Sequence, residues 1–255
     1  MHQNTNEWTE WRKQGIGASE VPIVIGISPW STPYQLWQEK TGRKKSFEGN
    51  HVTHRGQELE SKARKLYELT ALEDMAPQVA IHPKYPICRC SLDGIRADGN
   101  LILEIKCPGE ETHALAKAGK LPPYYMAQVQ YQLAVTGADS CHYFSFGKDE
   151  SFALIEVLPD LKQQGELIAA ALHFWDDYIL KDIPPPLMPQ DVKEVNSPQF
   201  ESLFALAARG SVEAKFNIIN IGGHNKIRFG KYLCTKIKSK SGKDTYRLTT
   251  RTDGT

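Results

Sequence analysis

The sequence predicts an α/β protein in which helices flank a mixed central β-sheet, followed by a small basic C-terminal appendage. Segments with apolar residues at helical spacing alternate with short extended segments, which is typical of an α/β domain. Residues 184–189 hold four prolines in six positions and can form neither a helix nor a central strand. From Arg209 onward the chain has 11 Lys and Arg against 3 Asp and Glu, an excess that suits a polyanionic partner and equally a solvated tail. We therefore predict a main domain, a linker and an appendage over residues 1–183, 184–196 and 197–255.

The first elements of the main domain are marked by their ends. Thr32 suits a helix N-cap, Pro33 the first helical position and Gly42 the end of the same helix. Residues 55–70 carry apolar residues at helical spacing and predict the next helix. Three extended segments follow, at residues 78–82, 87–92 and 101–107. The turn residues 98–100 (Asp-Gly-Asn) before the third segment predict a β-hairpin.

The rest of the chain continues the alternation. A helix is predicted over residues 123–136, where Gly137 ends it, and another over residues 161–180. Between them, residues 142–146 and 152–157 predict two strands on either side of a turn at 147–149. In the appendage we expect a short helix over 197–208 and a hairpin around 241–243 within the basic segment 226–251. Lysines on such a hairpin suit contacts to a DNA backbone, and they equally suit an exposed edge protected from aggregation.

Three residues carry the chemistry that the sequence predicts. Side chains alternate along a strand, so Glu104 and Lys106 share one face while Leu103 and Ile105 share the other. Asp93 is expected at a turn, from which the hairpin returns it to Glu104. Two adjacent carboxylates repel each other unless a cation neutralises them, and Mg²⁺ prefers a small number of such oxygen ligands.

Each of these pieces also has a plain structural explanation. An Asp-Gly pair such as residues 93–94 is typical of a turn, and Glu104 with Lys106 is typical of a solvated strand face. The whole spaced set, with Glu60 and Gln128 placed before and after it, favours an active site.

The pattern Asp-x₁₀-Glu-x-Lys after a helix bearing Glu60 resembles the PD-(D/E)xK nuclease superfamily. More specifically, the chain resembles the YqaJ-type viral recombinases, the group that includes phage lambda exonuclease. The matching blocks occur in the family's order between residues 8 and 180: WTEWR (8–12) with IGASE (16–20), GISPW (26–30) with TPYQLW (32–37), RGQELE (55–60), and YYMAQVQY (124–131). Leu92 departs from the superfamily's proline, at a position that shapes the turn and supplies no ligand.

The resemblance implies a role for each matched residue. Asp93 and Glu104 would bind the metal directly, with the Ile105 carbonyl as a third ligand. Glu60 would bind a second metal or its water. Lys106 would orient or deprotonate the attacking water, and Gln128 would hold a metal-bound water. Arg12 and Ser19 would bind the 5′-phosphate of a DNA end, which also fits Ser19 as the N-cap of a helix; without the resemblance, a plain cap and a surface charge would explain both.

The activity implied by the resemblance is a metal-dependent DNA exonuclease of homologous recombination. It would hydrolyse linear double-stranded DNA 5′→3′ from a 5′-phosphorylated end, using Mg²⁺ or Mn²⁺ with two ions in each active site. It would work as a ring-shaped homotrimer and leave 3′ overhangs for a single-strand annealing protein. No apolar run is long enough to span a bilayer and no signal peptide is evident, so we expect a cytoplasmic protein without membrane contact.

Three alternatives remain open from the sequence. The first is a sequence- or structure-specific endonuclease on the same core, and the second is a DNA-binding module without catalysis. The third, a CRISPR-adaptation nuclease, would need four grouped cysteines for an iron–sulfur cluster. The five cysteines here are not grouped in that way, so we expect free thiols and no cluster. Of the tryptophans at 8, 11, 30 and 37, any could stack on a base, and at least two are expected in the core.

Overall fold

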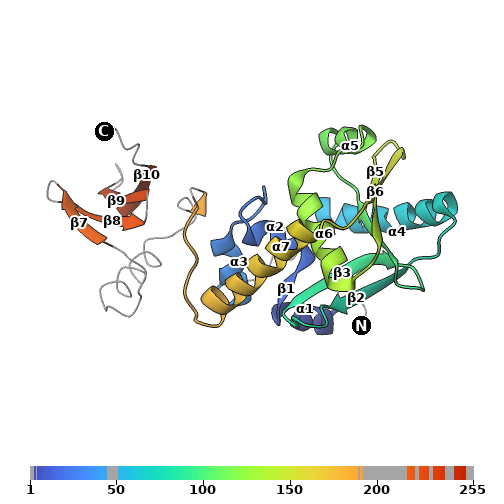
Figure 1. Cartoon of the computed structure of the whole chain (residues 1–255). Coiled ribbons are helices and arrows are strands. Elements are labelled where there is room, and N and C mark those ends of the chain that lie inside the picture. The colour runs from blue at the N-terminus through green and yellow to red at the C-terminus, as the bar shows by residue number, and fades with distance from the viewer. Residues whose placement is uncertain are drawn as a thin grey trace.

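The computed structural model describes residues 3, 5–44, 51–188 and 190–191, and the backbone of four strands between residues 217 and 250. Within residues 51–58 only the helical backbone is described. The helices of the main domain are α1 (Asn6–Lys13), η1 (Ala18–Glu20), α2 (Val21–Val24), α3 (Pro33–Lys40), α4 (His51–Ala71), α5 (Glu110–Lys117), α6 (Pro123–Thr136), α7 (Leu161–Phe174) and η2 (Trp175–Ile179). The strands are β1 (Ile16–Gly17), β2 (Ala76–Ile81), β3 (Cys88–Ile95), β4 (Leu101–Lys106), β5 (Ser140–Phe146) and β6 (Phe152–Val157). The predicted α/β class with a mixed, helix-flanked sheet is confirmed (Figure 1).

The helix ends follow the local signals of the sequence. Thr32 caps α3 by accepting a hydrogen bond from the Gln35 backbone N–H, and Pro33 takes the first helical position. Gly137 ends α6 in the left-handed conformation, with φ 73°. The last predicted helix differs from the prediction, because α7 ends at Phe174 and the chain continues as one π-helical turn, η2. The sequence reading did not anticipate α1, α5 or β1.

The central sheet has the order β1-β3-β4-β5-β6, with β2 paired to β3 as well. Strand β2 is antiparallel to β3 and pairs with it between Arg89 and Ile95. On β3, β1 pairs with Cys88 and Arg89, whereas β4 pairs with Gly94 and Ile95. Because β2 occupies one edge of β3, β1 and β4 must share the other edge at its two ends. The middle of that edge, between Arg89 and Gly94, is therefore not covered by a neighbouring strand.

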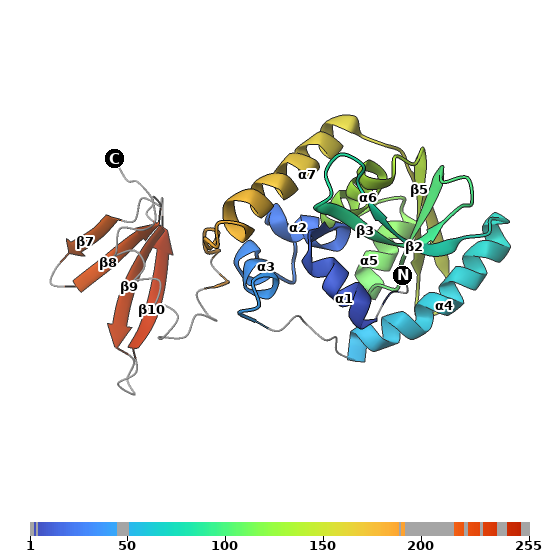
Figure 2. The same ribbon diagram turned by 90° about the horizontal axis from the view of Figure 1, so that it is seen from below.

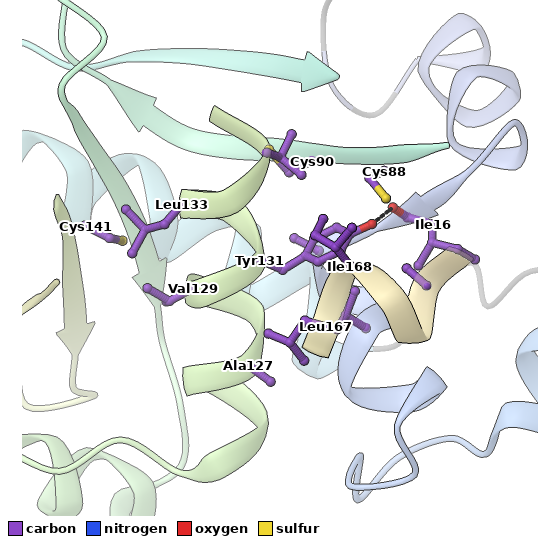
Figure 3. Close-up of a cluster of buried hydrophobic side chains, with 14 of the residues drawn as sticks. Ile16, Cys88, Cys90, Ala127, Val129, Tyr131, Leu133, Cys141, Leu167 and Ile168 are labelled. Carbon is purple, nitrogen blue, oxygen red and sulfur yellow. Dashed lines mark hydrogen bonds between the residues drawn. The ribbon is translucent and has the colours of Figure 1, made fainter. Parts of the chain in front are cut away.

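Helices cover both faces of this sheet (Figure 2). On one face α6 and α7 pack over a large apolar cluster, in which Tyr131 donates a hydrogen bond of 3.2 Å to the Ile16 carbonyl (Figure 3). On the other face α4 packs on a smaller cluster that includes Tyr67 and Leu103. Strand β4 thus lies in the centre of the domain with both faces buried.

The described part of the C-terminal segment is a separate four-stranded antiparallel sheet of order β10-β9-β8-β7. Its strands are β7 (Asn217–Ile221), β8 (His224–Phe229), β9 (Tyr232–Lys238) and β10 (Asp244–Thr250). Strands β9 and β10 pair antiparallel where the sequence predicts one hairpin, and β7 and β8 extend that pair to a sheet. The short helix expected over residues 197–208 lies outside the described residues.

Candidate active site

Asp93 and Glu104 are neighbours because of the hairpin between β3 and β4. Gly94 pairs with Leu103, and beyond this pair β4 separates from β3. The Ile105 backbone N–H then donates to Asp93 Oδ2 at 2.7 Å, so a side chain replaces the missing backbone acceptor. The expectation that Asp93 sits at a turn is wrong. Asp93 lies inside β3, and the turn follows that strand at residues 97–100.

Glu104 is almost fully buried and is held by three donors. Its Oε1 accepts from Gln128 Nε2 at 2.6 Å and lies 2.5 Å from Lys106 Nζ. Its Oε2 accepts from Gln132 Nε2 at 2.5 Å. The sequence reading missed Gln132, although a second glutamine four residues after Gln128 lies on the same helix face and was a usable signal. The Gln132 Oε1 atom is buried with no hydrogen-bond partner among the described residues.

Burial and neighbouring charges shift the pKa values of Asp93 and Lys106. Burial and the adjacent Glu104 raise the pKa of Asp93 well above its ordinary value. Burial opposes the charge of Lys106, but the charges of Glu104 and Asp93 outweigh it and raise the pKa of Lys106. The two carboxylates therefore favour the cationic form of Lys106.

Glu60 lies beside this group and is not part of it. Its carboxylate on α4 forms an ion pair with Arg64 at 2.9 Å and is more than one-third exposed. Its charge nevertheless reaches Asp93, since it contributes to the raised pKa of that carboxyl. Across the described residues, no three His, Cys, Asp or Glu side chains gather closely enough to form a metal site by themselves. The acidic core of the site is therefore the Asp93–Glu104 pair.

Arg12 and Ser19 approach the same place from the N-terminal segment. Arg12 Nη2 lies 3.5 Å from Ser19 Oγ and 3.2 Å from Glu20 Oε1. The expectation that Ser19 is an N-cap is wrong: Gly17 occupies that position, and Ser19 lies inside the three-residue helix η1. The reason is Glu20, whose carboxylate accepts from the Gly17 backbone N–H at 2.7 Å and fixes the turn two residues earlier. Ser19 thus offers its hydroxyl group and not a helix end.

A buried ion pair fixes the segment that carries Arg12. Lys40 Nζ lies 2.8 Å from Glu20 Oε2, and both side chains are at most one-tenth exposed. The same ammonium donates to the backbone carbonyls of Arg12 and Gly15, at 2.7 Å each. Burial tends to raise the pKa of Glu20, but Lys40 and Arg12 outweigh it and lower the pKa.

One pocket of about 180 Å³ collects these groups. It opens where the edge of β3 is uncovered between β1 and β4, which explains why strand, helix and N-terminal residues meet there. Its lining residues are Trp8, Trp11, Arg12, Gly17, Ala18, Ser19, Cys90, Ser91, Asp93, Glu104, Lys106 and Gln128. Among the residues predicted for the site, Glu60 and Ile105 are outside this lining. Trp8, which the sequence reading did not assign, donates from Nε1 to Ser91 Oγ at 2.9 Å and thereby joins α1 to β3.

Two of the known structures that resemble this chain are of one enzyme. The alkaline exonuclease from Laribacter hongkongensis aligns with 80% of this chain and 99% of its own, at 26% identity and a TM-score of 0.62. A second structure of that enzyme, in complex with dAMP, gives 25% identity and a TM-score of 0.63. A phage-related exonuclease from Haemophilus somnus shares the fold, with 16% identity and a TM-score of 0.50 over 66% of this chain. The central sheet and its helices are therefore those of known nucleases.

Two curated proteins are related in sequence. The Bacillus subtilis protein YqaJ is 27% identical over 187 residues, which is 71% of this chain and 59% of that protein. The mimivirus protein R354 is 27% identical over 166 residues, which is 59% of this chain and 30% of that protein. The chain therefore spans well under two-thirds of the length of either relative. Neither name states an activity.

Two further findings complete the description. Among the described residues, no helix combines the length and apolar character needed to cross a membrane. The model of the YqaJ-like viral recombinase domain matches residues 7–139, which include Arg12, Asp93, Glu104, Lys106 and Gln128. The chain belongs to the YqaJ-like viral recombinase family.

Proposed function

We propose that this protein is a metal-dependent DNA exonuclease of homologous recombination. It digests linear duplex DNA 5′→3′ from a 5′-phosphorylated end and leaves 3′ overhangs for a single-strand annealing protein. The observation that carries the proposal is the single pocket that unites Arg12 and Ser19 with Asp93, Glu104 and Lys106. A guanidinium and a hydroxyl group beside a nuclease-type carboxylate pair suit a terminal phosphate. The structural likeness to the Laribacter alkaline exonuclease supports the same reaction class.

The residues of the site fit a divalent cation. Asp93 and Glu104 would supply hard oxygen ligands and the Ile105 carbonyl a third, and Mg²⁺ commonly takes one or two carboxylates with waters and substrate phosphate. The raised pKa of Asp93 reflects its burial and the charge of the adjacent Glu104, and a bound cation would oppose both effects. The unpartnered Gln132 Oε1 is a further polar oxygen at this place. We propose Mg²⁺, with Mn²⁺ as a substitute and Glu60 next to a second ion. When bound, the metal supplies Lewis-acid activation of the phosphodiester and of water.

The chain's own residues then have distinct tasks. Lys106 lies beside Glu104, where it orients or deprotonates the attacking water and stabilises negative charge on the phosphoryl group. Gln128 and Gln132 hold the two oxygens of Glu104 and so fix the direction of that carboxylate. Arg12 and Ser19 hold the 5′-phosphate, which sets the distance from the strand end to the bond that is cut.

The remaining parts of the proposal concern organisation. We propose that residues 1–183 form the nuclease domain, with 184–196 as linker and 197–255 as appendage. The basic sequence of the appendage supports a role in DNA or partner contact. We further propose a homotrimeric ring in the cytoplasm, since a ring that encircles duplex DNA allows many cuts in one binding event.

A labelled linear duplex tests the proposal. The duplex carries a label at the 3′ end of one strand and ends in either 5′-phosphate or 5′-hydroxyl, and it is incubated with Mg²⁺, Mn²⁺ or EDTA. The expected result is stepwise, metal-dependent loss of the 5′-phosphorylated strand, abolished in Lys106→Ala and slower on the 5′-hydroxyl end. Cutting of closed circles with linear ends left intact would instead identify an endonuclease on this core. DNA binding without any cutting would refute the enzymatic proposal.

A further inference from the structure

The structure separates the tryptophans that the sequence alone could not tell apart. Trp37 belongs to the hydrophobic core and is 5% exposed. Trp8 and Trp11 line the active-site pocket. Trp30 is different, because 68% of its surface is exposed in the loop between α2 and α3. An exposed indole offers a flat face on which a nucleic-acid base can stack.

Trp30 rests on two tyrosines that begin α6. Its ring centre lies 4.9 Å from that of Tyr124, edge to face at 76°, and 6.1 Å from that of Tyr125. The two tyrosine rings contact each other at 4.6 Å. Lys106 Nζ in turn lies 5.3 Å from the centre of the Tyr125 ring, which is a cation–π contact. Aromatic contacts therefore run without interruption from the exposed indole to the lysine of the active site.

The loop that carries Trp30 is fixed at both ends. Ser28 Oγ accepts a hydrogen bond from the Trp30 backbone N–H at 3.3 Å, and Pro29 lies between them. Two residues after Trp30, the buried Thr32 caps α3 and is hydrogen-bonded to Asp191. An aromatic side chain on such a loop has few rotatable bonds and loses little entropy when it binds a flat ligand.

The dimensions of the pocket indicate what that ligand is. At about 180 Å³ the pocket lies below the range of about 300–1,000 Å³ that is typical for small-molecule sites, which suits the phosphate and sugar of one strand better than a base pair. When a strand enters such a pocket unpaired, its bases lose their stacking neighbours. An aromatic surface that reaches Lys106 through Tyr125 can replace those neighbours.

We propose that Trp30, supported by Tyr124 and Tyr125, is a stacking platform for an unpaired base of the strand that enters the active site. The proposal deepens the exonuclease function and rests on it. Stacking tolerates any base because every base has a flat π-face, so the platform holds the strand without selecting a sequence.

A double-mutant cycle between protein and DNA tests the platform. Binding of 5′-phosphorylated duplexes is measured by fluorescence anisotropy in EDTA, with either all bases present or one abasic residue at the first, second or third position of the 5′ strand. At one position, loss of the base should weaken binding to the wild type by about 30-fold, the middle of the range for one stacked base. Trp30→Ala should bind the intact and abasic duplexes equally, and Trp30→Phe should keep most of the difference. Leu72→Ala is the matched control: Leu72 is 89% exposed just after α4, at an end that both overall views place far from α2 and α3 (Figures 1 and 2).

The outcomes distinguish this platform from the proposed function. Equal abasic penalties in the wild type and Trp30→Ala at all three positions would overturn the platform and leave the exonuclease proposal standing. A change of oligomeric state in Trp30→Ala by light scattering, without any coupling to a base, would overturn it in favour of a protein contact. A wild type that binds ends but never cuts them would refute only the nuclease, since the cycle reads binding. A wild type that binds no DNA end would overturn both.

Discussion

Replacing Lys40 with methionine should both destabilise the fold and loosen the proposed phosphate site. The change removes the ammonium that neutralises Glu20 and that holds the Arg12 and Gly15 carbonyls. Methionine keeps a similar length and flexibility, so little packing is lost. The buried Glu20 carboxylate then keeps Arg12 as its charged partner, and the Arg12 side chain is one-third exposed.

The structure sets the size of the effect. Removal of one partner from a buried ion pair costs about 3–5 kcal/mol, and the side chains of Glu20 and Lys40 are only 10% and 5% exposed. Because Arg12 still offsets part of the charge, we expect the lower end, about 3 kcal/mol. For a chain of this length that corresponds to a fall of roughly 6–12 °C in Tm.

Urea unfolding of four proteins measures this prediction: wild type, Lys40→Met, Glu20→Gln and the double variant. The double variant should recover part of the loss, since it removes both charges together. Lys13→Met is the matched control, because Lys13 pairs with Glu10 at 2.6 Å on the exposed surface and should contribute less than about 1 kcal/mol. On DNA ends, Lys40→Met should also lose most of the preference for 5′-phosphate over 5′-hydroxyl, as Arg12 is no longer held. The reasoning is refuted if Lys40→Met costs no more than Lys13→Met, or if the single-variant effects simply add.

Three further predictions follow from the same contacts. Gly94→Ala should cost about 1–3 kcal/mol in thermal unfolding, because the added Cβ would lie 2.7 Å from Met75 Cβ. Asp93→Asn should raise the stability of the metal-free protein at neutral pH, since burial and Glu104 raise the pKa of Asp93 and the ionised form is disfavoured there. Mg²⁺ at one hundred times its Kd should stabilise the wild type by about 2.7 kcal/mol, seen as a rise in Tm. The same variant should lose this stabilisation. Because the pKa of Glu20 is lowered, its contribution to the free energy of unfolding should be present above the ordinary carboxyl pKa and lost as the pH falls through the lowered value. In urea unfolding at a series of pH values, the stability of Glu20→Gln should therefore fall less in acid than that of the wild type.

Each of these has an outcome that contradicts it. For the glycine, Gly165→Ala in α7 is the control, since its Cβ meets open space and the change should stabilise the helix by about 0.5–1 kcal/mol. A Gly94→Ala protein as stable as Gly165→Ala would show that the strand yields without cost. An Mg²⁺-induced shift that survives Asp93→Asn would remove Asp93 from the metal site. Parallel acid profiles of the wild type and Glu20→Gln would mean that the buried pair does not lower the pKa of Glu20.

Local signals predicted the regular elements well. The helix α6 begins and ends where the sequence places it, because Pro123 suits its first turn and Gly137 has the left-handed conformation that ends a helix. The alternation of Glu104 and Lys106 with Leu103 and Ile105 is likewise confirmed, with the apolar pair in the cluster under α4. These features depend on neighbours within a few residues, which the sequence displays directly.

Two placements at the site were wrong because they were inferred from one or two residues without the side chains that contact them. Asp93-Gly94 has the composition of a turn, yet Gly94 is not needed for a positive φ, and its role is to leave space for Met75 and Leu103 across the sheet. Ser19 has the composition of an N-cap, yet the Glu20 carboxylate moves the helix start to Gly17. Packing between strands decides the first case, and a contact between residues three positions apart along the chain decides the second.

The site itself is an irregularity of the sheet. If β4 had continued to pair with β3, the Ile105 N–H would bond to a backbone carbonyl and the Asp93 side chain would have no reason to turn toward it. Because the strands separate after Gly94 and Leu103, one oxygen of Asp93 completes the hydrogen bonding of β4 while the carboxylate lies beside Glu104. The same separation leaves the edge of β3 uncovered and lets the segment of Arg12 and Ser19 close the pocket. The geometry that opens the sheet therefore also orients the carboxylate pair, and a change that restored regular pairing would remove the pocket and the alignment together.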